Sequence, residues 1–507
     1  MAPSIGPLMT KAPDSVIILG GGTAGWMAAN LIQRRWGADG TTVTLIESPT
    51  IGIVGVGEGS TPQLKAFFDT LGIAEAEWMP RCNATYKAGI EFAGWSDQPG
   101  YERYFHPFPT NLDHLTQGQF FYSARVRRTG RDVPAHPDPF FIPTRIAREG
   151  RAPLAPPNFP FSISYGYHFD AHLIGAFLSE FGTARGIRHV EAKIASVELD
   201  DTGDVGALIA DDGRRFEADL FVDASGFRAA IIEGALNEPH RSFDENLFND
   251  RAVVAPTPLH SEGAQACTRS IAKSAGWIWN IPLTNRMGNG YVYSSRYIDD
   301  DAAAAELRAH IGLPEDAEVR HLKMKCGRIE RSWVRNCLAV GLAQGFLEPL
   351  EATALHIVMN TIESFLDAWN GQRRDEFNAD IASRYEGIRD YLVCHYRTAR
   401  RSDTDYWRDA TSNNVLSDSL KAVITAWFTG QDLEQEVTRQ DIGRFYMPMS
   451  WHCMLAGYGN FPAPEMLKPP GPEITRFDMA DLDRFVGGCA MNFPAHADAL
   501  AQLQSAG

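Results

Sequence analysis

Six residues near the N-terminus, Gly20-Gly21-Gly22-Thr23-Ala24-Gly25, fit the pattern G-x-G-x-x-G. In this pattern the first glycine makes a tight turn, the second lets a pyrophosphate approach the backbone, and the third allows close helix–strand packing. The N–H groups that open the following helix face the anion. Glu47, 22 residues after Gly25, stands where an acid that binds a ribose hydroxyl belongs. The motif predicts a dinucleotide site, and a purely structural glycine turn is the alternative. The expected contacts are Gly20, Gly22, Thr23, Ala24, Gly25 and Glu47.

A second segment favours a flavin over a nicotinamide as the dinucleotide. Residues 220–226 read as a strand that ends in Asp-x-Ser-Gly, far along the chain from the glycine motif. Two-part flavoproteins commonly return a strand and a glycine turn to the dinucleotide site. We therefore expect Asp223 to contribute to cofactor binding, with an ordinary strand end as the alternative.

Two tryptophans spaced by two, Trp277 and Trp279, open a motif that continues to Ile281 and Pro282. Side chains two residues apart on a strand point to the same face. A pair of large, rigid indoles on one face would line a cavity and exclude water. A tryptophan pair in an ordinary core is the alternative, and the residues alone do not identify the cavity.

These motifs need a scaffold of strands and helices to position them. A β-branched run, a helix and a second strand, at residues 16–19, 26–36 and 41–46, form one βαβ unit. Further along we expect an irregular region rich in proline and aromatics at residues 97–160, a helix at 169–185 and a strand meander at 190–223. Two strands follow at 277–283 and 291–297, and the chain from about residue 355 to the end is expected to be helical. The layout predicts an α/β nucleotide-binding core interleaved with a second domain and followed by a helical part.

Composition excludes several classes of function. The chain has 507 residues and a net charge of −16, so a general nucleic-acid binder is not expected. Seven scattered cysteines without a Cys-x-x-Cys pair favour neither a disulfide framework nor a zinc site, and no metal site is expected. Neither a signal peptide nor a membrane span is recognisable, which predicts a cytoplasmic protein without a membrane partner.

Several motifs occur together in this one chain. They are the glycine motif, Asn83-Ala84-Thr85-Tyr86-Lys87, residues 166–170, 221–227 and 277–282, and the stretch from Gly345 to Thr353. This combination resembles the flavin-dependent tryptophan halogenase family, over residues 16–460 or nearly the whole chain. The tryptophan-pair motif separates these halogenases from sister flavin monooxygenases, so the resemblance is specific.

The resemblance implies a Rossmann-type FAD-binding core of the flavin monooxygenase kind, with an interleaved β-sheet domain and a helical C-terminal part. The implied division begins with a flexible leader at residues 1–15. A core follows at residues 16–360, with interleaved substrate-side segments at about 97–165 and 227–330. A helical region at residues 361–507 completes the substrate site. It also implies FAD used as FADH2, a separate flavin reductase that supplies it, and chloride or bromide converted to hypohalous acid.

In the family the hypohalous acid travels through a tunnel to a lysine beside a small aromatic substrate, and Lys87 matches that lysine. Its ammonium form can hydrogen-bond hypohalous acid and its neutral amine can form a haloamine; burial makes both forms accessible. Glu351 matches the active-site glutamate, which stabilises the cationic ring and assists proton loss. Glu348 is the fallback if the register differs.

Further roles follow from the same resemblance. Thr353 and Ala354 match positions whose backbone N–H groups hold the halide. Leu342 and Leu355 are expected to contact the flavin. His106, Phe108 and Trp451 match residues that stack on the substrate ring. Two departures concern the substrate. Ala352 stands where the family often has serine, and residues 445–457 lack the paired tyrosines and acid that hold the amino-acid group of free tryptophan. We therefore expect an indole-like ring rather than free tryptophan as the substrate.

Other functions remain as alternatives at this point. A flavin monooxygenase would hydroxylate an aromatic held beside the flavin, and a non-catalytic flavin-binding protein would bind FAD without halide-dependent turnover. A nicotinamide dehydrogenase has no use for the second nucleotide segment or the tryptophan pair.

Overall fold

The glycine motif follows a central strand of a six-stranded sheet with the order β20-β21-β12-β1-β2-β8. β1 (Ser15–Leu19) pairs in parallel with β12 (Leu220–Asp223) and with β2 (Thr42–Glu47). Its apolar, β-branched residues are buried, as expected for a parallel sheet covered on both faces. The other strands are β8 (Arg188–Glu191), β20 (Trp333–Val334) and β21 (Cys337–Ala339). The computed structural model describes residues 11–49, 57–259, 261 and 263–506.

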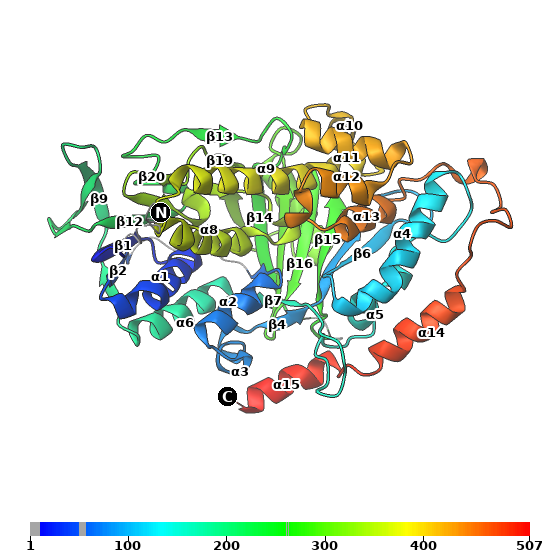
Figure 1. The fold of residues 1–507 in the computed structure, drawn as a ribbon, viewed down its shortest axis with the longest axis horizontal. Helices are drawn as coiled ribbons and strands as arrows, with labels where there is room; N and C mark the ends of the chain where they lie inside the picture. The colour runs from blue at the N-terminus through cyan, green and yellow to red at the C-terminus, as the bar shows by residue number, and fades with distance from the viewer. Residues whose placement is uncertain (1–10, 50–56, 260, 262, 507) are drawn as a thin grey trace, which may run out of the picture.

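A second large sheet has seven strands in the order β18-β14-β17-β16-β15-β5-β6 and is antiparallel except between β15 and β5. It stands in the middle of the molecule in Figure 1, between the nucleotide-binding sheet on the left and a group of helices on the right. Its strands are β5 (Gly89–Ala93), β6 (Arg103–Pro107), β14 (Arg251–Thr257), β15 (Cys267–Lys273), β16 (Gly276–Pro282), β17 (Met287–Tyr293) and β18 (Arg320–Lys323).

Three small sheets complete the β-structure. One joins β3 (Glu58–Gly59), β7 (Gly166–Phe169) and β4 (Thr85–Lys87), and so brings three distant parts of the chain together. The predicted meander is present as β9 (Ile194–Leu199), β10 (Val205–Ala210) and β11 (Arg215–Phe216). The third sheet contains β13 (His240–Ser242), β19 (Gly327–Ile329) and β22 (Gly345–Phe346).

Two long helices lie side by side in Figure 1, α8 (Ala354–Trp369) and α9 (Arg374–Thr398), and α9 runs from the left part of the molecule toward the helices on the right. The 25 residues of α9 correspond to about 37 Å at 1.5 Å per residue. The helices of the nucleotide-binding half are α1 (Thr23–Trp36), α2 (Gln63–Leu71), α3 (Glu75–Trp78) and α6 (Ala171–Thr183). The others are α4 (His114–Arg128), α5 (Ile142–Arg148), α7 (Asp300–Ile311), α10 (Asp405–Ser412), α11 (Asp418–Phe428), α12 (Leu433–Arg439) and α13 (Pro448–Gly457).

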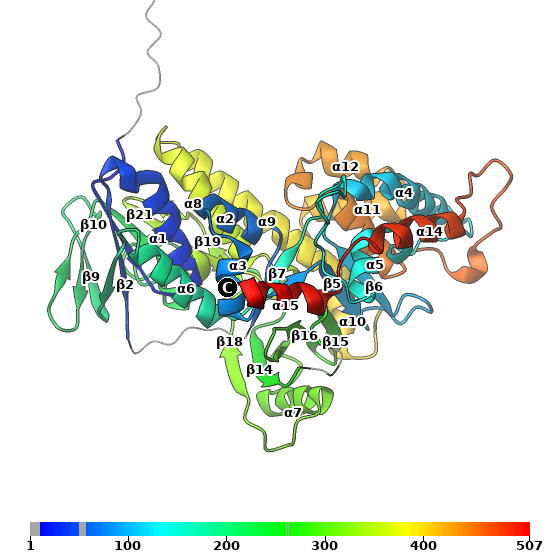
Figure 2. The same ribbon diagram turned by 90° about the horizontal axis from the view of Figure 1, so that it is seen from below.

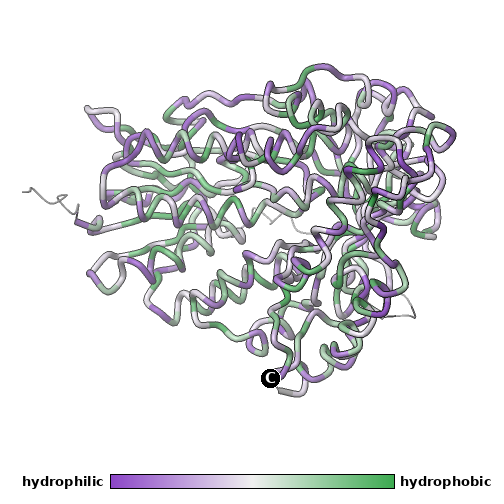
Figure 3. The backbone as a smooth tube through the Cα atoms, turned by 45° about the vertical axis from the view of Figure 1, so that its right-hand side comes forward, coloured by the Kyte–Doolittle hydropathy of each residue, from purple (hydrophilic) through white to green (hydrophobic). Residues whose placement is uncertain are grey.

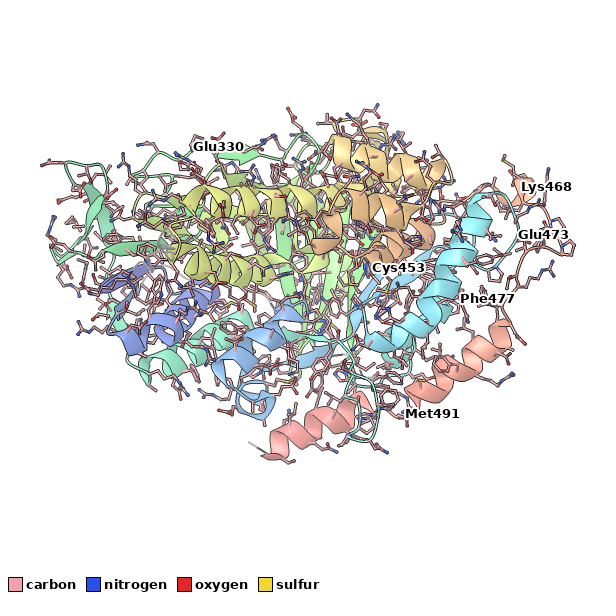
Figure 4. All side chains as sticks on the ribbon, in the orientation of Figure 1. Glu330, Cys453, Lys468, Glu473, Phe477 and Met491 are labelled. Carbon is pink, nitrogen blue, oxygen red and sulfur yellow. The ribbon has the colours of Figure 1, made fainter. Side chains whose placement is uncertain are left out.

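The last part of the chain wraps around the outside. Figure 4 labels Lys468, Glu473, Phe477 and Met491 along this path, whereas Cys453 lies within α13. The path continues through α14 (Met479–Ala490) and α15 (His496–Ala506), which ends beside α3 (Figures 1 and 2).

One hydrophobic core contains residues of both large sheets, among them Leu45 and Val292. Figure 3 shows hydrophobic segments mainly in the inner strands and hydrophilic ones along the outer loops. Within the part of the chain that the structure describes, no helix is both long and apolar enough to cross a membrane.

Most predicted elements are present, with two corrections. The region 97–160 is not irregular throughout, because it contains β6, α4 and α5. The buried face of α4 includes the polar residues Thr116 and Ser123, so the sequence shows no clear apolar periodicity from which the helix could be predicted. The strand predicted at 291–297 begins earlier, since β17 covers Met287–Tyr293.

Candidate active site

The glycine motif forms the turn between β1 and α1. Gly20 has a φ of +124°, and a Cβ there would lie 2.1 Å from the carbonyl oxygen of Ala224. A Cβ on Gly25 would lie 1.9 Å from the oxygen of Gly20, whereas a Cβ on Gly22 would meet nothing within 4 Å. Two of the glycines are therefore needed for packing, and Gly22 leaves open space at the start of α1. Gly22 caps α1 without any side-chain hydrogen bond, so the first N–H groups of the helix have no cap from it.

Glu47 ends β2 directly beside this turn. Its Oε1 lies 2.6 Å from Nε2 of His189 on β8, which holds the carboxylate in place. Leu342 lies in the short helix η6 (Gly341–Ala343), and Gly341 approaches Ala24 so closely that a Cβ would lie 2.7 Å from the Cβ of Ala24. An open, uncapped helix start with an acid at its side fits the pyrophosphate and ribose of FAD.

Asp223 binds the turn that follows its own strand. Its Oδ1 accepts hydrogen bonds from the N–H and hydroxyl of Ser225, and its Oδ2 accepts from the N–H groups of Ile231 and Ile232, all within 3.0 Å. The carboxylate is fully buried. Asp223 therefore fixes the turn after β12, against which Gly20 packs.

Lys87 lies at the end of β4 in the small sheet. Its side chain has no solvent exposure, and its Nζ has no hydrogen-bond partner within the described residues. Burial lowers the pKa of the ammonium to about 8, although Glu351 acts in the opposite direction. The Nζ also lies 5.4 Å from the centre of the Phe108 ring. An unpartnered buried ammonium is costly to folding, which makes Lys87 a candidate functional residue.

His168, a buried histidine within the sequence motif at residues 166–170, links strands around Lys87 by hydrogen bonds. The two ring nitrogens of His168 lie 3.0 Å from Oγ1 of Thr85 and 2.9 Å from Oγ1 of Thr268. Thr85 donates its hydroxyl to the carbonyl of Pro282 at 2.8 Å. The end of the tryptophan-pair motif is thus tied to the strand that carries Lys87. Gly59 makes room for the ammonium, because a Cβ there would lie 3.1 Å from Nζ.

Glu351 ends the short helix η7 (Pro349–Glu351) and is also buried. Burial raises the pKa of its carboxyl, whereas His106 and Lys87 lower it. Nδ1 of His106 lies 3.6 Å from Oε1 of Glu351, too far for a hydrogen bond, and burial lowers the pKa of His106. Ala352 turns the chain sharply after Glu351, with a φ of +56°. Lys87, Glu351, His106 and Phe108 are therefore brought together.

Glu348 faces another group of residues. Its Oε2 accepts hydrogen bonds from Trp277 Nε1 at 3.2 Å and from Asn249 Nδ2 at 2.8 Å, as well as from the hydroxyl of Tyr396. The structure therefore favours Glu351 over the fallback Glu348 for the catalytic position. Glu348 instead joins the stretch after β22 to the tryptophan pair.

The tryptophan-pair motif occupies β16, as predicted. The rings of Trp277 and Trp279 lie 6.1 Å apart, and Nε1 of Trp279 is buried without a hydrogen-bond partner. A Cβ on Gly290 would lie 2.1 Å from the Trp279 ring, so this glycine of β17 makes room for it. Ile281 is buried beside them.

The predicted halide residues lie at the start of α8. Thr353 is its N-cap and Ala354 its first residue, so their N–H groups belong to the positive end of a 16-residue helix. Leu355 follows and is buried. The geometry suits an anion held by backbone donors, which the alanine at 354 does not impair.

Trp451 on α13 is the one predicted ring residue that the structure sets apart. Its ring lies 4.8 Å from that of Tyr391, which in turn lies 6.2 Å from that of His106. Tyr391 therefore stands between the two predicted stacking residues. Tyr446 stacks on Tyr391 at 3.5 Å, and its hydroxyl is buried without a partner.

Sequence reasoning missed the polar residues that surround Glu351, namely Tyr104, Tyr391, His395, Tyr446 and Tyr458. One signal could have found two of them. Tyr391 and His395 stand four residues apart on a helix and therefore share a face.

The uncapped glycine turn fits a dinucleotide, and Lys87 and Glu351 lie buried near one another at a second place in the molecule. The family described as tryptophan halogenase matches residues 15–468. The chain is 38% identical over 453 residues to tryptophan 6-halogenase SttH from Streptomyces toxytricini, covering 82% of this chain and 84% of that protein.

Solved structures agree with this result. The chain superimposes with a TM-score of 0.81 and 34% identity on Xcc4156, a flavin-dependent halogenase from Xanthomonas campestris, over 97% of this chain and 98% of that one. BrvH, a flavin-dependent halogenase from Brevundimonas sp. BAL3, gives a TM-score of 0.81 and 33% identity over 97% of this chain and 100% of that one.

The protein belongs to the tryptophan halogenase family. The predicted resemblance, the fold class and the prediction of an FAD-dependent halogenase are thereby confirmed, and neither the monooxygenase nor the non-catalytic flavin-binding alternative is favoured. The roles of individual site residues and the division into domains stay predictions.

Proposed function

We propose that this protein halogenates the ring of a neutral indole derivative, with Lys87 and Glu351 as its catalytic residues. The observation that carries the proposal is the buried, unpartnered Nζ of Lys87 beside a second buried charge, Glu351. FAD, bound at the glycine turn and supplied reduced by a separate flavin reductase, provides the activation of oxygen that converts halide to hypohalous acid.

The two catalytic residues divide the substitution between them. The Lys87 ammonium holds hypohalous acid by a hydrogen bond and polarises its halogen. The ring carbon takes the halogen while the oxygen–halogen bond breaks, and the leaving hydroxide takes a proton from Lys87 to give water. Glu351 stabilises the positive ring and accepts the proton from the attacked carbon. The halide is proposed to wait at the N–H groups of Thr353 and Ala354.

The substrate is proposed to carry its ring without a charged amino-acid group. Tyr446 offers a hydroxyl in the segment where free tryptophan would need an acid, and the hydroxyl is buried without a partner. A zwitterionic group drawn into this space would lose its hydration without recovering an ionic contact. His106 and Phe108 supply aromatic surface beside Lys87 and Glu351, and aromatic pairs contribute about 0.5–1.5 kcal/mol each beyond burial.

A competition experiment tests the substrate. Equimolar indole and tryptophan are offered together with bromide, FAD, oxygen and a flavin reductase, and products are measured by mass spectrometry. Preferential bromination of indole is expected. Preferential bromination of tryptophan would show that another part of the chain binds the amino-acid group.

A second experiment tests the catalytic lysine. Lys87→Ala should abolish halogenation of either substrate while FAD binding and oxidation of reduced flavin continue. Substantial halogenation by this variant would remove Lys87 from the mechanism.

We also propose a cytoplasmic location. All seven cysteines are unpaired, and six of them are buried, which fits a reducing compartment.

A further inference from the structure

A buried histidine outside all the sequence motifs contacts Glu351 directly. His395 lies on α9 with no solvent exposure. Its Nε2 lies 2.9 Å from Oε1 of Glu351, and its Nδ1 lies 2.7 Å from the hydroxyl oxygen of Tyr458. The imidazole therefore joins a carboxylate on one side to a phenol on the other.

The hydrogen-bond roles in this row follow from the groups present. When Glu351 is ionised it only accepts hydrogen bonds, and Nε2 of His395 then carries the proton that faces it. Burial lowers the pKa of His395 to about 3, so the ring is neutral and its Nδ1 is an acceptor. The hydroxyl of Tyr458 must then donate to Nδ1. One tautomer satisfies all three residues.

Aromatic rings enclose the imidazole and hold its plane. Phe92 stacks on it with centroids 4.8 Å apart, and Tyr391 lies edge-on at 5.2 Å. Trp95 and Tyr458 contact it edge-on at 6.0 and 5.8 Å. The ring is thus fixed by packing, which is what a group that must orient another side chain requires.

We propose that His395 and Tyr458 are positioning residues for Glu351, holding one carboxylate oxygen so that the ionised group faces the substrate ring in a fixed orientation. The inference rests on the proposed catalytic role of Glu351. Burial opposes ionisation of this carboxyl, and the N–H of His395 acts against that effect by binding the charged form. The other titratable groups that face Glu351 are Lys87, His106 and four tyrosines, Tyr104, Tyr391, Tyr446 and Tyr458. Burial raises the pKa of each of these tyrosines, so they stay neutral over the pH range of the profile.

The effect of removing the donor can be measured in a pH profile. His395→Phe keeps a ring inside the aromatic enclosure but donates no hydrogen bond. Hydrogen bonds to charged groups are strong enough that kcat for halogenation should fall about 10-fold to 100-fold. The acid limb of the profile should move to higher pH, because Glu351 is then harder to ionise. The oxidant reported by a thiol trap should be unchanged.

Three further variants separate positioning from folding. His395→Gln retains an N–H donor and should restore part of kcat and of the acid limb. Tyr458→Phe removes only the outer hydrogen bond and should shift the limb in the same direction by less. Tyr385→Phe is the matched control, since Tyr385 is a buried tyrosine of the same helix whose hydroxyl donates to Gln344 at 3.2 Å, and it should leave the limb in place.

The outcomes are distinct. An unshifted limb in both His395→Phe and Tyr458→Phe would overturn the inference, as would an equal shift in Tyr385→Phe. If His395→Phe fails to fold, the shift in Tyr458→Phe decides. Failure of the proposed function would instead appear as full halogenation by Glu351→Gln, whatever the His395 variants do.

Discussion

Replacing Lys87 by a neutral side chain should stabilise the folded protein at neutral pH while removing its activity. Burial lowers the pKa of this ammonium from its ordinary 10.5 to about 8. At about 1.36 kcal/mol per pKa unit, the folded state loses about 3 kcal/mol at pH 7 by keeping the group charged. Because the folded-state pKa lies below the unfolded one, this loss is complete below pH 8 and disappears as pH rises through 10.5.

The measurement is the melting temperature of Lys87→Met, which keeps the aliphatic stem. An unfolding entropy of about 2.1 cal/mol/K per residue over 507 residues converts 3 kcal/mol to a rise of about 3 °C. The rise should be present at pH 7 and absent at pH 10.5. Lys421→Met is the control, because Lys421 is exposed and paired with Asp418, and it should show no such rise. A lower melting temperature at pH 7, or an equal difference at both pH values, would refute the reasoning.

Three further outcomes are expected. Glu351→Gln should lower halogenation by about 10²–10³, the usual cost of removing one electrostatic stabiliser, and a parallel fall in thiol-trapped oxidant would contradict this role. Wild-type halogenation should decrease as pH rises through about 8, because Lys87 loses the proton that polarises the halogen; an increase would favour the neutral amine. Gly22→Ala should keep the melting temperature of FAD-free protein, since its Cβ meets nothing within 4 Å, yet weaken FAD binding in a fluorescence titration. Unchanged FAD affinity would remove Gly22 from the cofactor site.

The cofactor half of the molecule could be predicted from sequence because its signals are local. A β-branched strand, three glycines and a helix follow one another within residues 15–36, so spacing alone places them. Asp223 shows where local reasoning ends. Its position at the end of β12 was predicted, but its four hydrogen bonds to residues 225–232 depend on how the following loop folds back.

The substrate half could be predicted only in part, because its residues come together through tertiary contacts. Lys87 and Glu351 were proposed from resemblance, and no spacing in the sequence indicates that they are close. His395 and Tyr458 lie 44 and 107 residues beyond Glu351, on segments that carry no motif. The strand at 287–293 was misplaced for a related reason. Gly288 and Gly290 weaken the strand signal, and Gly290 is there because the ring of Trp279 on the neighbouring strand needs the space.

The stretch from Gly345 to Ala354 makes the two halves depend on one another. Glu348 binds the indole N–H of Trp277, Glu351 faces Lys87 and the histidines, and Thr353 with Ala354 opens the helix proposed to hold the halide. These ten residues thus contact the tryptophan pair and contain the proposed catalytic carboxylate and the proposed halide position. The left-handed Ala352 sets the turn between the last two, at a backbone angle that costs an alanine about 1 kcal/mol. A displacement of this stretch would move the carboxylate and the halide donors together. Substitutions here should therefore change the rates of both oxidant formation and ring substitution, whereas substitutions of His395 should change the rate of ring substitution alone.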